Sequence, residues 1–325
     1  MEKYDVCILG AGPSGYAACI RALDFGLKTI LIEKNRIGGA GVYHGALSSK
    51  TLWELSRDFR KLNIIDRGFK VKEYRTDYRD IVRVMGNAVE ERKWQLEFQL
   101  REFEAKYCTG RFHLAKGKGV LRTNHEVEIE TEMGSETIWA ENIILATGSR
   151  PRTLPDIPID EKIIVTSDGI ASFEDFPESL VILGAGVIGC EFATIFANFG
   201  KTRVFLIDKA DRILPFEDND VATTVAQNLE ASGVTIHRNA SLESMTIEGD
   251  RVKYILRYTN GKVQTYYAEK GLVSVGRVTN TDGIGLEELG LQFGKRGDVV
   301  VDDVVTSIPN VYAVGDLTAD INLVN

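Results

Sequence analysis

Residues 5–33 read DVCILGAGPSGYAACIRALDFGLKTILIE, and this stretch decides the fold. It begins with a short continuous apolar run, Asp5 to Leu9, which is typical of a fully buried parallel strand. A glycine-rich turn from Gly10 to Gly15 follows, then a helical stretch, and then a second apolar run that closes on Glu33. The pattern predicts a strand, a helix and a second parallel strand, joined by a tight turn.

The same arrangement occurs a second time in the chain. Residues 179–208 read SLVILGAGVIGCEFATIFANFGKTRVFLID, with the glycine turn at Gly184 to Gly189 and a terminal acid at Asp208. One G-x-G-x-x-G turn alone is weak evidence, because a tight turn of any kind favours glycine. Two copies, each after an apolar strand and each with its own acid, predict two dinucleotide-binding sites.

Each residue of such a unit has a separate role. The first glycine permits the sharp bend, the second lets backbone N–H groups approach a pyrophosphate, and the third lets helix and strand pack closely. The phosphates then lie at the helix N-terminus, and the acid accepts hydrogen bonds from ribose hydroxyls. The residues expected to bind cofactor in these two units are Gly10, Gly12, Ser14, Gly15, Glu33, Gly184, Gly186, Val187, Ile188, Gly189 and Asp208.

The acid of the second unit also indicates which nicotinamide nucleotide it prefers. A carboxylate at Asp208 would repel the 2′-phosphate of NADP, so the second site should prefer NAD. Lys209 and Arg212 lie close by in the sequence and oppose this preference.

The segments between and after the glycine turns complete the prediction of the fold. Residues 80–107 have apolar residues near helical spacing and predict one long amphipathic helix, continuous or broken near Gly86, with Trp94 in the core. Residues 119–139 predict a small antiparallel meander. The fold class is therefore α/β, with two Rossmann-like dinucleotide-binding domains, each with a parallel sheet and a small antiparallel meander. Pro151, Pro155 and Pro158 mark a linker, and the second glycine unit begins the next domain.

Composition narrows the class of protein further. The 325 residues suggest roughly two domains, and 44% hydrophobic residues supply a sizeable core. Interleaved charges with a net charge of −8 make a nucleic-acid or anionic-membrane surface unexpected. We expect a cytoplasmic protein, because the N-terminus shows no secretory signal and no stretch could comfortably span a membrane. Cys7, Cys19, Cys108 and Cys190 have no metal-like spacing and are expected to be buried, with no metal site.

The order of these segments resembles the class I pyridine nucleotide-disulfide oxidoreductases, flavoproteins that bind two dinucleotides. The resemblance covers essentially the whole chain, and within the family it is nearest to dihydrolipoamide dehydrogenase and the soluble pyridine nucleotide transhydrogenases. The segments that carry it are Gly10 to Gly15 with Glu33, Ala146-Thr147-Gly148, Gly184 to Glu191 with Asp208, Val275 to Asn280, and Val311 to Asp316.

This resemblance implies the cofactors FAD and NAD(H) and adds residues to the expected site. It implies that the FAD-binding domain is discontinuous, residues 1–150 plus 272–325, and that residues 151–271 form the NAD-binding domain. It implies that Asp316 binds the ribityl chain of FAD. It also implies that Lys50 and Glu191 form an ion pair beside the flavin N5 edge, where hydride arrives, although a lysine at a helix start can also be merely solvated. The further residues implied to bind cofactor are Gly39, Ala146, Thr147, Gly148, Gly276, Arg277 and Gly315.

The chain departs from the family in the loop that follows the first unit. Disulfide-reducing members carry two cysteines there, with four residues between them. Residues 38–50 read GGAGVYHGALSSK, so Gly41 and Ala46 occupy the cysteine positions. Without a thiolate there is no nucleophile for a disulfide. His44 could act as a substitute proton carrier, but a lone histidine in a glycine-rich loop is more often a turn or packing residue.

A second departure concerns the end of the sequence. The family continues past the Gly-Asp motif with a helix and a dimerisation domain, whereas this sequence stops at Asn325, nine residues beyond Asp316. If this is the natural length, the usual family homodimer is lost. If the sequence is a fragment, that domain returns.

These observations predict an FAD-dependent oxidoreductase that accepts hydride from NAD(P)H and passes electrons to a small-molecule acceptor other than a disulfide. The acceptor could be a second nicotinamide nucleotide, a quinone or a dye-like oxidant, and a partner protein is a further alternative. A rival hypothesis is a non-catalytic or decayed nucleotide-binding member of the family that binds FAD weakly. Loss of both cysteines favours the rival, and retention of Lys50, Glu191 and Asp316 opposes it.

Overall fold

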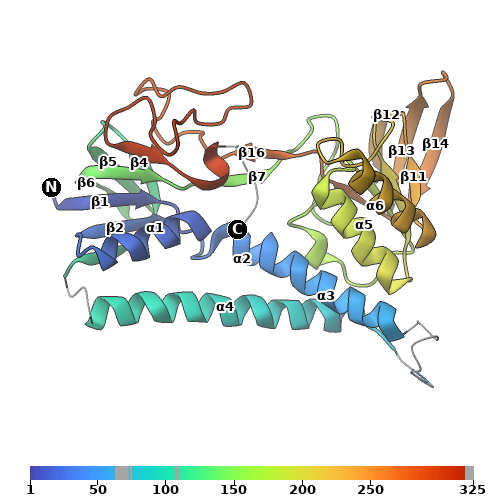
Figure 1. Cartoon of the computed structure of the whole chain (residues 1–325), viewed down its shortest axis with the longest axis horizontal. Coiled ribbons are helices and arrows are strands. Elements are labelled where there is room, and N and C mark those ends of the chain that lie inside the picture. Colours follow the sequence, from blue (N-terminus) through green and yellow to red (C-terminus); the bar gives the residue numbers. More distant parts are fainter. Residues whose placement is uncertain (63–72, 74, 107–109, 319–325) are drawn as a thin grey trace. The chain divides into compact units, whose positions relative to one another are not determined.

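The computed structural model describes residues 1–62, 73, 75–106 and 110–318 (Figure 1). They form two compact units, and each is described by itself. The first unit comprises Met1–Leu47, Val89–Arg150 and Arg277–Asn325, and the second comprises Ser48–Ala88 and Pro151–Gly276.

The first unit is built on a seven-stranded sheet with the order β3-β2-β1-β6-β5-β4, in which β17 also pairs with β6. Strands β3, β2, β1 and the second half of β6 run parallel, and β4, β5 and the first half of β6 form an antiparallel meander. Its strands are β1 (Lys3–Leu9), β2 (Thr29–Glu33), β3 (Phe112–Lys116), β4 (Lys118–Leu121), β5 (Glu126–Thr131), β6 (Gly134–Leu145) and β17 (Val311–Ala313). A separate two-stranded sheet pairs β7 (Ser149–Pro151) with β16 (Arg277–Thr279).

Burial explains why the parallel strands of this sheet are continuously apolar. Every residue of β2 is buried, and so are the last four residues of β1, because helices cover the sheet. Helix α1 (Pro13–Asp24) lies along β1 and β2 in Figure 1 and buries Cys19, Ala22 and Leu23. The short elements α2 (Gly39–Tyr43) and η3 (Gly315–Thr318) also belong to this unit.

The second unit repeats the parallel sheet in the order β11-β10-β9-β15-β8, and it adds an antiparallel sheet of three strands. Helix α5 packs on β9 and β10, and α6 lies beside α5 (Figure 1). The elements are β8 (Ile164–Thr166), η2 (Ile170–Ser172), β9 (Ser179–Leu183), α5 (Val187–Phe199), β10 (Arg203–Ile207), α6 (Asn219–Ala231), β11 (Thr235–His237), β12 (Ala240–Glu248), β13 (Arg251–Tyr258), β14 (Val263–Ala268) and β15 (Lys270–Val273). The predicted fold class, two dinucleotide-type α/β modules each with an antiparallel meander, is confirmed.

Two helices contribute to both units. Helix α3 (Ala46–Leu62) lies almost entirely in the second unit, and α4 (Tyr78–Lys106) belongs to the second unit up to Ala88 and to the first unit from Val89. Leu52 of α3 joins the hydrophobic core around α5, as do Tyr78 and Met85 of α4, and the Tyr78 hydroxyl donates to the Ile170 carbonyl at 2.8 Å. These contacts group the described residues of α3 from Ser48 and of α4 up to Ala88 with the second unit. The resemblance had implied that they belong to the first.

Helix α4 forms as predicted, but the residues that it buries differ from the prediction. It is continuous through Gly86, and the predicted end at Tyr107 lies outside the described residues. The expectation that Trp94 is a core residue is wrong, because its relative exposure is 61%. The buried stripe runs through Val89, Leu96 and Leu100 instead, and Trp94 stacks on exposed Phe98 with ring centroids 5.2 Å apart.

The described cysteines are buried, as expected. Cys7, Cys19 and Cys190 are in no disulfide within the described residues and are at most 5% exposed, and Cys108 lies outside the described residues. Burial, with a smaller contribution from Asp208, raises the pKa of the Cys190 thiol to about 12. In the described part of the chain no helix is both long enough and apolar enough to cross a bilayer.

Candidate functional site

The first glycine turn fits between the ends of two strands so tightly that side chains are excluded. Gly10 adopts φ of +100°, and a Cβ there would lie 2.4 Å from the Ala146 carbonyl oxygen. A Cβ at Gly15 would lie 1.9 Å from the carbonyl oxygen of Gly10. These two glycines therefore set the bend and the close approach of helix α1 to the sheet.

Gly12 is different, because the space beside it is open. A Cβ at Gly12 would meet no other atom within 4 Å. Gly12 is also the N-cap of α1, and no side chain caps this helix end, whose first turn contains Pro13 and no acid. Uncapped backbone N–H groups facing open space attract an anion. The structure thus provides a place where a diphosphate fits.

Glu33 lies at the end of β2 beside this turn. We call the Gly10–Gly15 turn, the N-terminus of α1 and the Glu33 carboxylate together the first cradle. Its Oε2 accepts a hydrogen bond from the backbone N–H of Ala11 at 2.7 Å, and its Oε1 accepts one from Asn35 at 2.6 Å. A cavity of about 380 Å³ adjoins the carboxylate, which is within the usual range for small-molecule sites. Sequence reasoning missed the rest of its lining, because no motif marks Arg36, Glu90, Lys93, Ala115 and Lys116.

Two residues distant in sequence contact the same turn. Gly39, at the start of α2, approaches so closely that its Cβ would lie 3.0 Å from the Gly12 Cα. Gly315 adopts φ of +72°, and a Cβ there would lie 2.4 Å from the Ser14 hydroxyl oxygen. The structure therefore brings together the predicted residues of the first glycine turn, α2 and the Gly-Asp motif.

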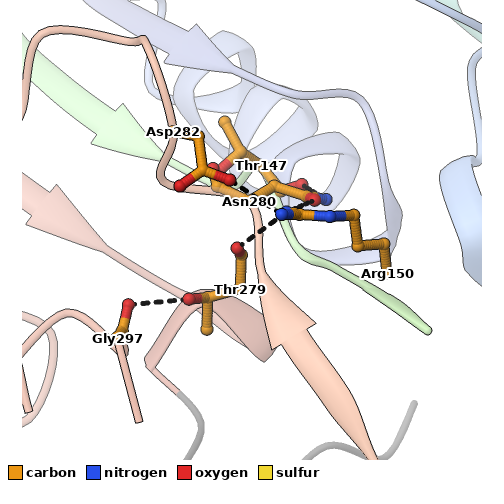
Figure 2. Close-up of polar contacts among 6 residues, drawn as sticks. All are labelled: Thr147, Arg150, Thr279, Asn280, Asp282 and Gly297. Atoms are coloured by element: carbon orange, nitrogen blue, oxygen red, sulfur yellow. Dashed lines mark hydrogen bonds and ion pairs between the residues drawn. The ribbon is translucent and has the colours of Figure 1, made fainter. Parts of the chain in front are cut away.

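The crossover turn after β6 is held by hydrogen bonds to β16 and the loop behind it (Figure 2). The Thr147 hydroxyl donates to the Asn280 carbonyl at 2.8 Å, and the Asn280 side-chain amide donates back to the Thr147 carbonyl at 2.9 Å. The backbone N–H of Asn280 donates to the Gly148 carbonyl at 2.9 Å. These bonds fix Gly148 at its φ of +69°.

Arg150 adds side-chain hydrogen bonds to the contact between the crossover turn and Asn280 (Figure 2). Its guanidinium donates to the Asn280 side-chain oxygen at 3.0 Å, to the Thr279 carbonyl at 3.1 Å, and to Asp282 at 2.7 Å. Sequence reasoning missed Arg150 as a site residue. The signal available was Asn280, the last residue of the segment Val275 to Asn280 that carries the resemblance.

The second glycine turn reproduces the first one in detail. Gly184 has φ of +99°, a Cβ at Gly189 would lie 2.0 Å from the Gly184 carbonyl oxygen, and a Cβ at Gly186 would meet nothing within 4 Å. Gly186 is the N-cap of α5, again without a side-chain cap. Val187, the first residue of α5, is 52% exposed at this helix end. Ile188 packs toward the core instead.

Asp208 repeats the contacts of Glu33. It accepts a hydrogen bond from the Ala185 N–H at 3.0 Å and one from the Ala210 N–H at 2.9 Å. Arg212, which had been expected to weaken the preference for NAD, donates its guanidinium N–H groups to Asn219 and to the Pro215 carbonyl. Gly276 ends the second unit with φ of +105° and open space beside its Cα.

The ion pair implied for Lys50 is present in the second unit. Lys50 Nζ lies 2.6 Å from Oε1 of Glu191, and the Ser49 hydroxyl donates to the other carboxylate oxygen at 3.2 Å. The Glu191 side chain is 16% exposed and that of Lys50 is 63% exposed. An exposed pair of this kind adds little to stability, so its fixed geometry is of more interest than its energy. Sequence reasoning missed Ser49.

Residues 38–50 contain the two positions at which the resemblance implied cysteines. Gly41 lies within α2, Ala46 begins α3, and exposed His44 follows α2 as its C-cap. The Tyr43 hydroxyl is buried without a partner among the described residues, and burial raises its pKa. No cluster of three or more metal-ligating side chains occurs in the described ranges.

A fold with two matching cradles, each with an uncapped helix N-terminus and a carboxylate at a strand end, defines a protein that binds two dinucleotides. Residues 4–325 match the family described as pyridine nucleotide-disulphide oxidoreductase, and the chain belongs to this family. Its cofactors are those of the family, FAD and NAD(H). Both cradles fit such groups, since Gly12 and Gly186 leave open space where phosphates would lie.

Similar proteins include dihydrolipoyl dehydrogenases. That of Chlamydia muridarum is 34% identical over 321 residues, a match that covers 98% of this chain and 66% of the relative. That of Bacillus subtilis is 32% identical over 326 residues, covering 99% and 68%. The chain thus spans about two thirds of the length of the curated relatives it matches.

Solved structures of flavoproteins and related proteins have a similar fold. LpdA from Mycobacterium tuberculosis superimposes with a TM-score of 0.87 at 27% identity, covering 99% of this chain and 69% of that one. The HOCl-induced flavoprotein disulfide reductase RclA from Escherichia coli superimposes with a TM-score of 0.83 at 25% identity, covering 98% and 67%.

Proposed function

We propose that this protein transfers hydride from NADH to FAD and passes the electrons to an acceptor other than a disulfide. The observation that carries the proposal is the pair of matching cradles combined with a segment, residues 38–50, that contains no sulfur. Family membership supports the oxidoreductase class and both cofactors.

The proposed assignment places FAD in the first unit and NAD(H) in the second. In the first unit the uncapped N-terminus of α1 would bind the diphosphate, and Glu33 would accept hydrogen bonds from the adenosine ribose. The cavity beside Glu33 supports this, because it has room for an adenine ring. In the second unit the N-terminus of α5 and Asp208 would play the same parts for NAD(H).

When bound, flavin supplies the redox chemistry, because it accepts hydride and releases electrons. The chain's own contribution is to bind, orient and provide charge. Lys50 is held by Glu191, and Ser49 holds the second oxygen of that carboxylate. We propose that this fixed cation stabilises the negative charge that develops on reduced flavin.

The absence of a cysteine in residues 38–50 supports the proposal that the electron acceptor is not a disulfide. Disulfide reduction needs a thiolate that attacks sulfur, and the described cysteines, Cys7, Cys19 and Cys190, are buried elsewhere. Burial raises the pKa of both Cys7 and Cys190, so neither provides a thiolate near neutral pH. We therefore propose that electrons leave the flavin directly for the acceptor.

The preference for NADH is expected to depend on Asp208. Replacing Asp208 by Ser removes a carboxylate from the expected ribose position. Replacing Lys209 by Arg keeps the positive charge but exchanges an ammonium for a guanidinium, which can bind a phosphate through two N–H groups. We expect the ratio of kcat/KM for NADPH to that for NADH to rise about 10-fold or more, since like charges near each other discriminate by several kcal/mol. Initial rates with each nucleotide measure it.

Lys209→Arg alone is the matched control for this change and should leave the ratio nearly unchanged. An unchanged ratio in the double variant would remove Asp208 from the ribose site.

The proposed function is tested by steady-state turnover of the FAD-loaded protein with NADH and a panel of acceptors. We expect reduction of a quinone, a dye or a nicotinamide analogue, and no reduction of lipoamide or glutathione disulfide. Tight FAD binding without NADH oxidation in the presence of any acceptor would favour a non-catalytic role.

A further inference from the structure

Ser149 stands between a cation and a carboxylate in the first unit. Arg277 Nε donates to the Ser149 hydroxyl oxygen at 2.7 Å, and the Ser149 hydroxyl lies 2.6 Å from Oδ2 of Asp316. Arg277 Nε itself is 3.7 Å from the same Oδ2, beyond normal hydrogen-bond distance. The serine therefore mediates the contact between the two charges.

The direction of these hydrogen bonds is fixed by the chemistry of the groups. A guanidinium can only donate, and a serine hydroxyl carries a single proton. Because the Ser149 oxygen accepts from Arg277, its own proton must be donated to Asp316. The bond to a carboxylate is charge-assisted and short, which makes it stronger than a bond between neutral groups.

Further contacts hold Ser149 in place. Arg277 Nη2 donates to the Ser149 carbonyl at 2.8 Å, so one guanidinium bridges the hydroxyl and the backbone of the same residue. Ser149 is 9% exposed, and the Arg277 side chain is 15% exposed. The preceding residues, Thr147 and Gly148, are held by Asn280. A buried hydrogen-bond network of this kind is rigid, so it fixes the orientation of the carboxylate that Ser149 contacts.

Among the described residues, Asp316 is thus bound through one carboxylate oxygen. Among the described residues no donor reaches Oδ1, and the Asp316 side chain is 28% exposed. Gly315, directly before it, packs on Ser14 at the start of α1, which places Asp316 beside the first cradle. The free oxygen is therefore available to accept a hydrogen bond from a hydroxyl group of a bound molecule.

We propose that Ser149 and Arg277 are positioning residues that orient Asp316, so that its free oxygen accepts a hydrogen bond from a ribityl hydroxyl of FAD. The inference rests on the proposed function, because it takes FAD to occupy the first cradle. Loss of the Ser149 hydroxyl frees the Asp316 carboxylate to turn and pair directly with Arg277. That pairing withdraws the acceptor from the ribityl chain.

The test compares FAD with ADP, which lacks the ribityl chain but shares the adenosine and diphosphate. Dissociation constants of both are measured on apoprotein by flavin fluorescence quenching and by competition. For Ser149→Ala we expect FAD to bind about 10- to 100-fold more weakly, the range for loss of a hydrogen bond to a charged group, and ADP to bind unchanged. Ser149→Thr keeps the hydroxyl and should bind FAD nearly as well as the unaltered protein.

Two further variants keep the test decisive. Thr306→Val removes a different buried hydroxyl of the first unit, one that donates to the Val311 carbonyl at 2.7 Å, and should change neither constant. Arg277→Lys retains the charge but cannot bridge the two oxygens of Ser149, and it should weaken FAD binding even if Ser149→Ala fails to fold.

The outcomes separate this inference from the function it rests on. An equal loss of FAD and ADP affinity in Ser149→Ala shows a merely structural role and overturns the inference. So does unchanged FAD affinity in that variant. Failure of the unaltered protein to bind FAD overturns the proposed function and the inference with it.

Discussion

The Gly12→Asp variant is expected to lose FAD binding while its fold stays intact. Gly12 is the N-cap of α1 with φ of −67°, and a Cβ there meets no atom within 4 Å. Aspartate is a favourable N-cap residue, so the helix should be unchanged or slightly stabilised. Its carboxylate, however, occupies the space proposed for the diphosphate and repels it.

The expected loss of FAD affinity is about 100-fold or more, because like charges in contact cost several kcal/mol. Flavin content after purification and the dissociation constant of added FAD measure it, and the thermal midpoint of the apoprotein reports the fold. Unchanged FAD binding together with an unchanged midpoint would show that the diphosphate does not lie at this helix end.

Gly186→Asp is the matched variant in the second unit. Gly186 is likewise the N-cap of α5, with φ of −77° and open space beside it. This variant should carry normal FAD and be reduced by dithionite, yet NADH should reduce its flavin at a strongly lowered rate. Loss of FAD binding in Gly12→Asp alone, together with slow reduction by NADH in Gly186→Asp alone, would assign one cofactor to each cradle. Loss of both cofactors in either variant would contradict the assignment.

The second prediction with a large expected effect is that the bound flavin exchanges no electrons with thiols. We expect that anaerobic dihydrolipoamide leaves the bound flavin oxidised, and that two-electron reduction by dithionite, with no NAD⁺ present, produces no thiolate-to-flavin charge-transfer band. Both depend on a thiolate at the flavin, and residues 38–50 contain no cysteine. Spectra recorded after each addition measure both, and either signal would show that another group does the work of the missing thiols.

A gain of function provides the control for that experiment. The double variant Gly41→Cys with Ala46→Cys places thiols at the two positions where disulfide-reducing members of the family carry them. If the sequence correspondence is right, reduction of this variant should produce the charge-transfer band that the unaltered protein lacks.

Local sequence patterns predicted the parts of the structure that local physics determines. The glycine turns are recognisable because a bend with positive φ and a close helix approach exclude side chains at Gly10, Gly15, Gly184 and Gly189. The buried parallel strands are recognisable because burial on both faces requires continuous apolar runs. The positions of Glu33 and Asp208 beside the glycine turns were predicted from their spacing in the sequence, and each carboxylate accepts a backbone hydrogen bond from its turn.

The remaining features depend on contacts between segments that are distant in sequence. Nothing local to Trp94 shows which side of α4 faces solvent, because apolar residues occur on both sides of this helix. Ser149 becomes informative only when Arg277 and Asp316 are seen beside it. The grouping of residues 48–88 with the second unit likewise depends on the packing of Leu52 and Tyr78 against a core formed by later residues.

Anaerobic titration of the FAD-loaded protein with NADH tests the central claim most directly. The account predicts that about one equivalent of NADH bleaches the visible absorbance of oxidised flavin, and that a non-sulfur oxidant restores it without any change in thiol content. A flavin that stays oxidised under excess NADH, or a protein that cannot hold FAD and NAD(H) together, would contradict it.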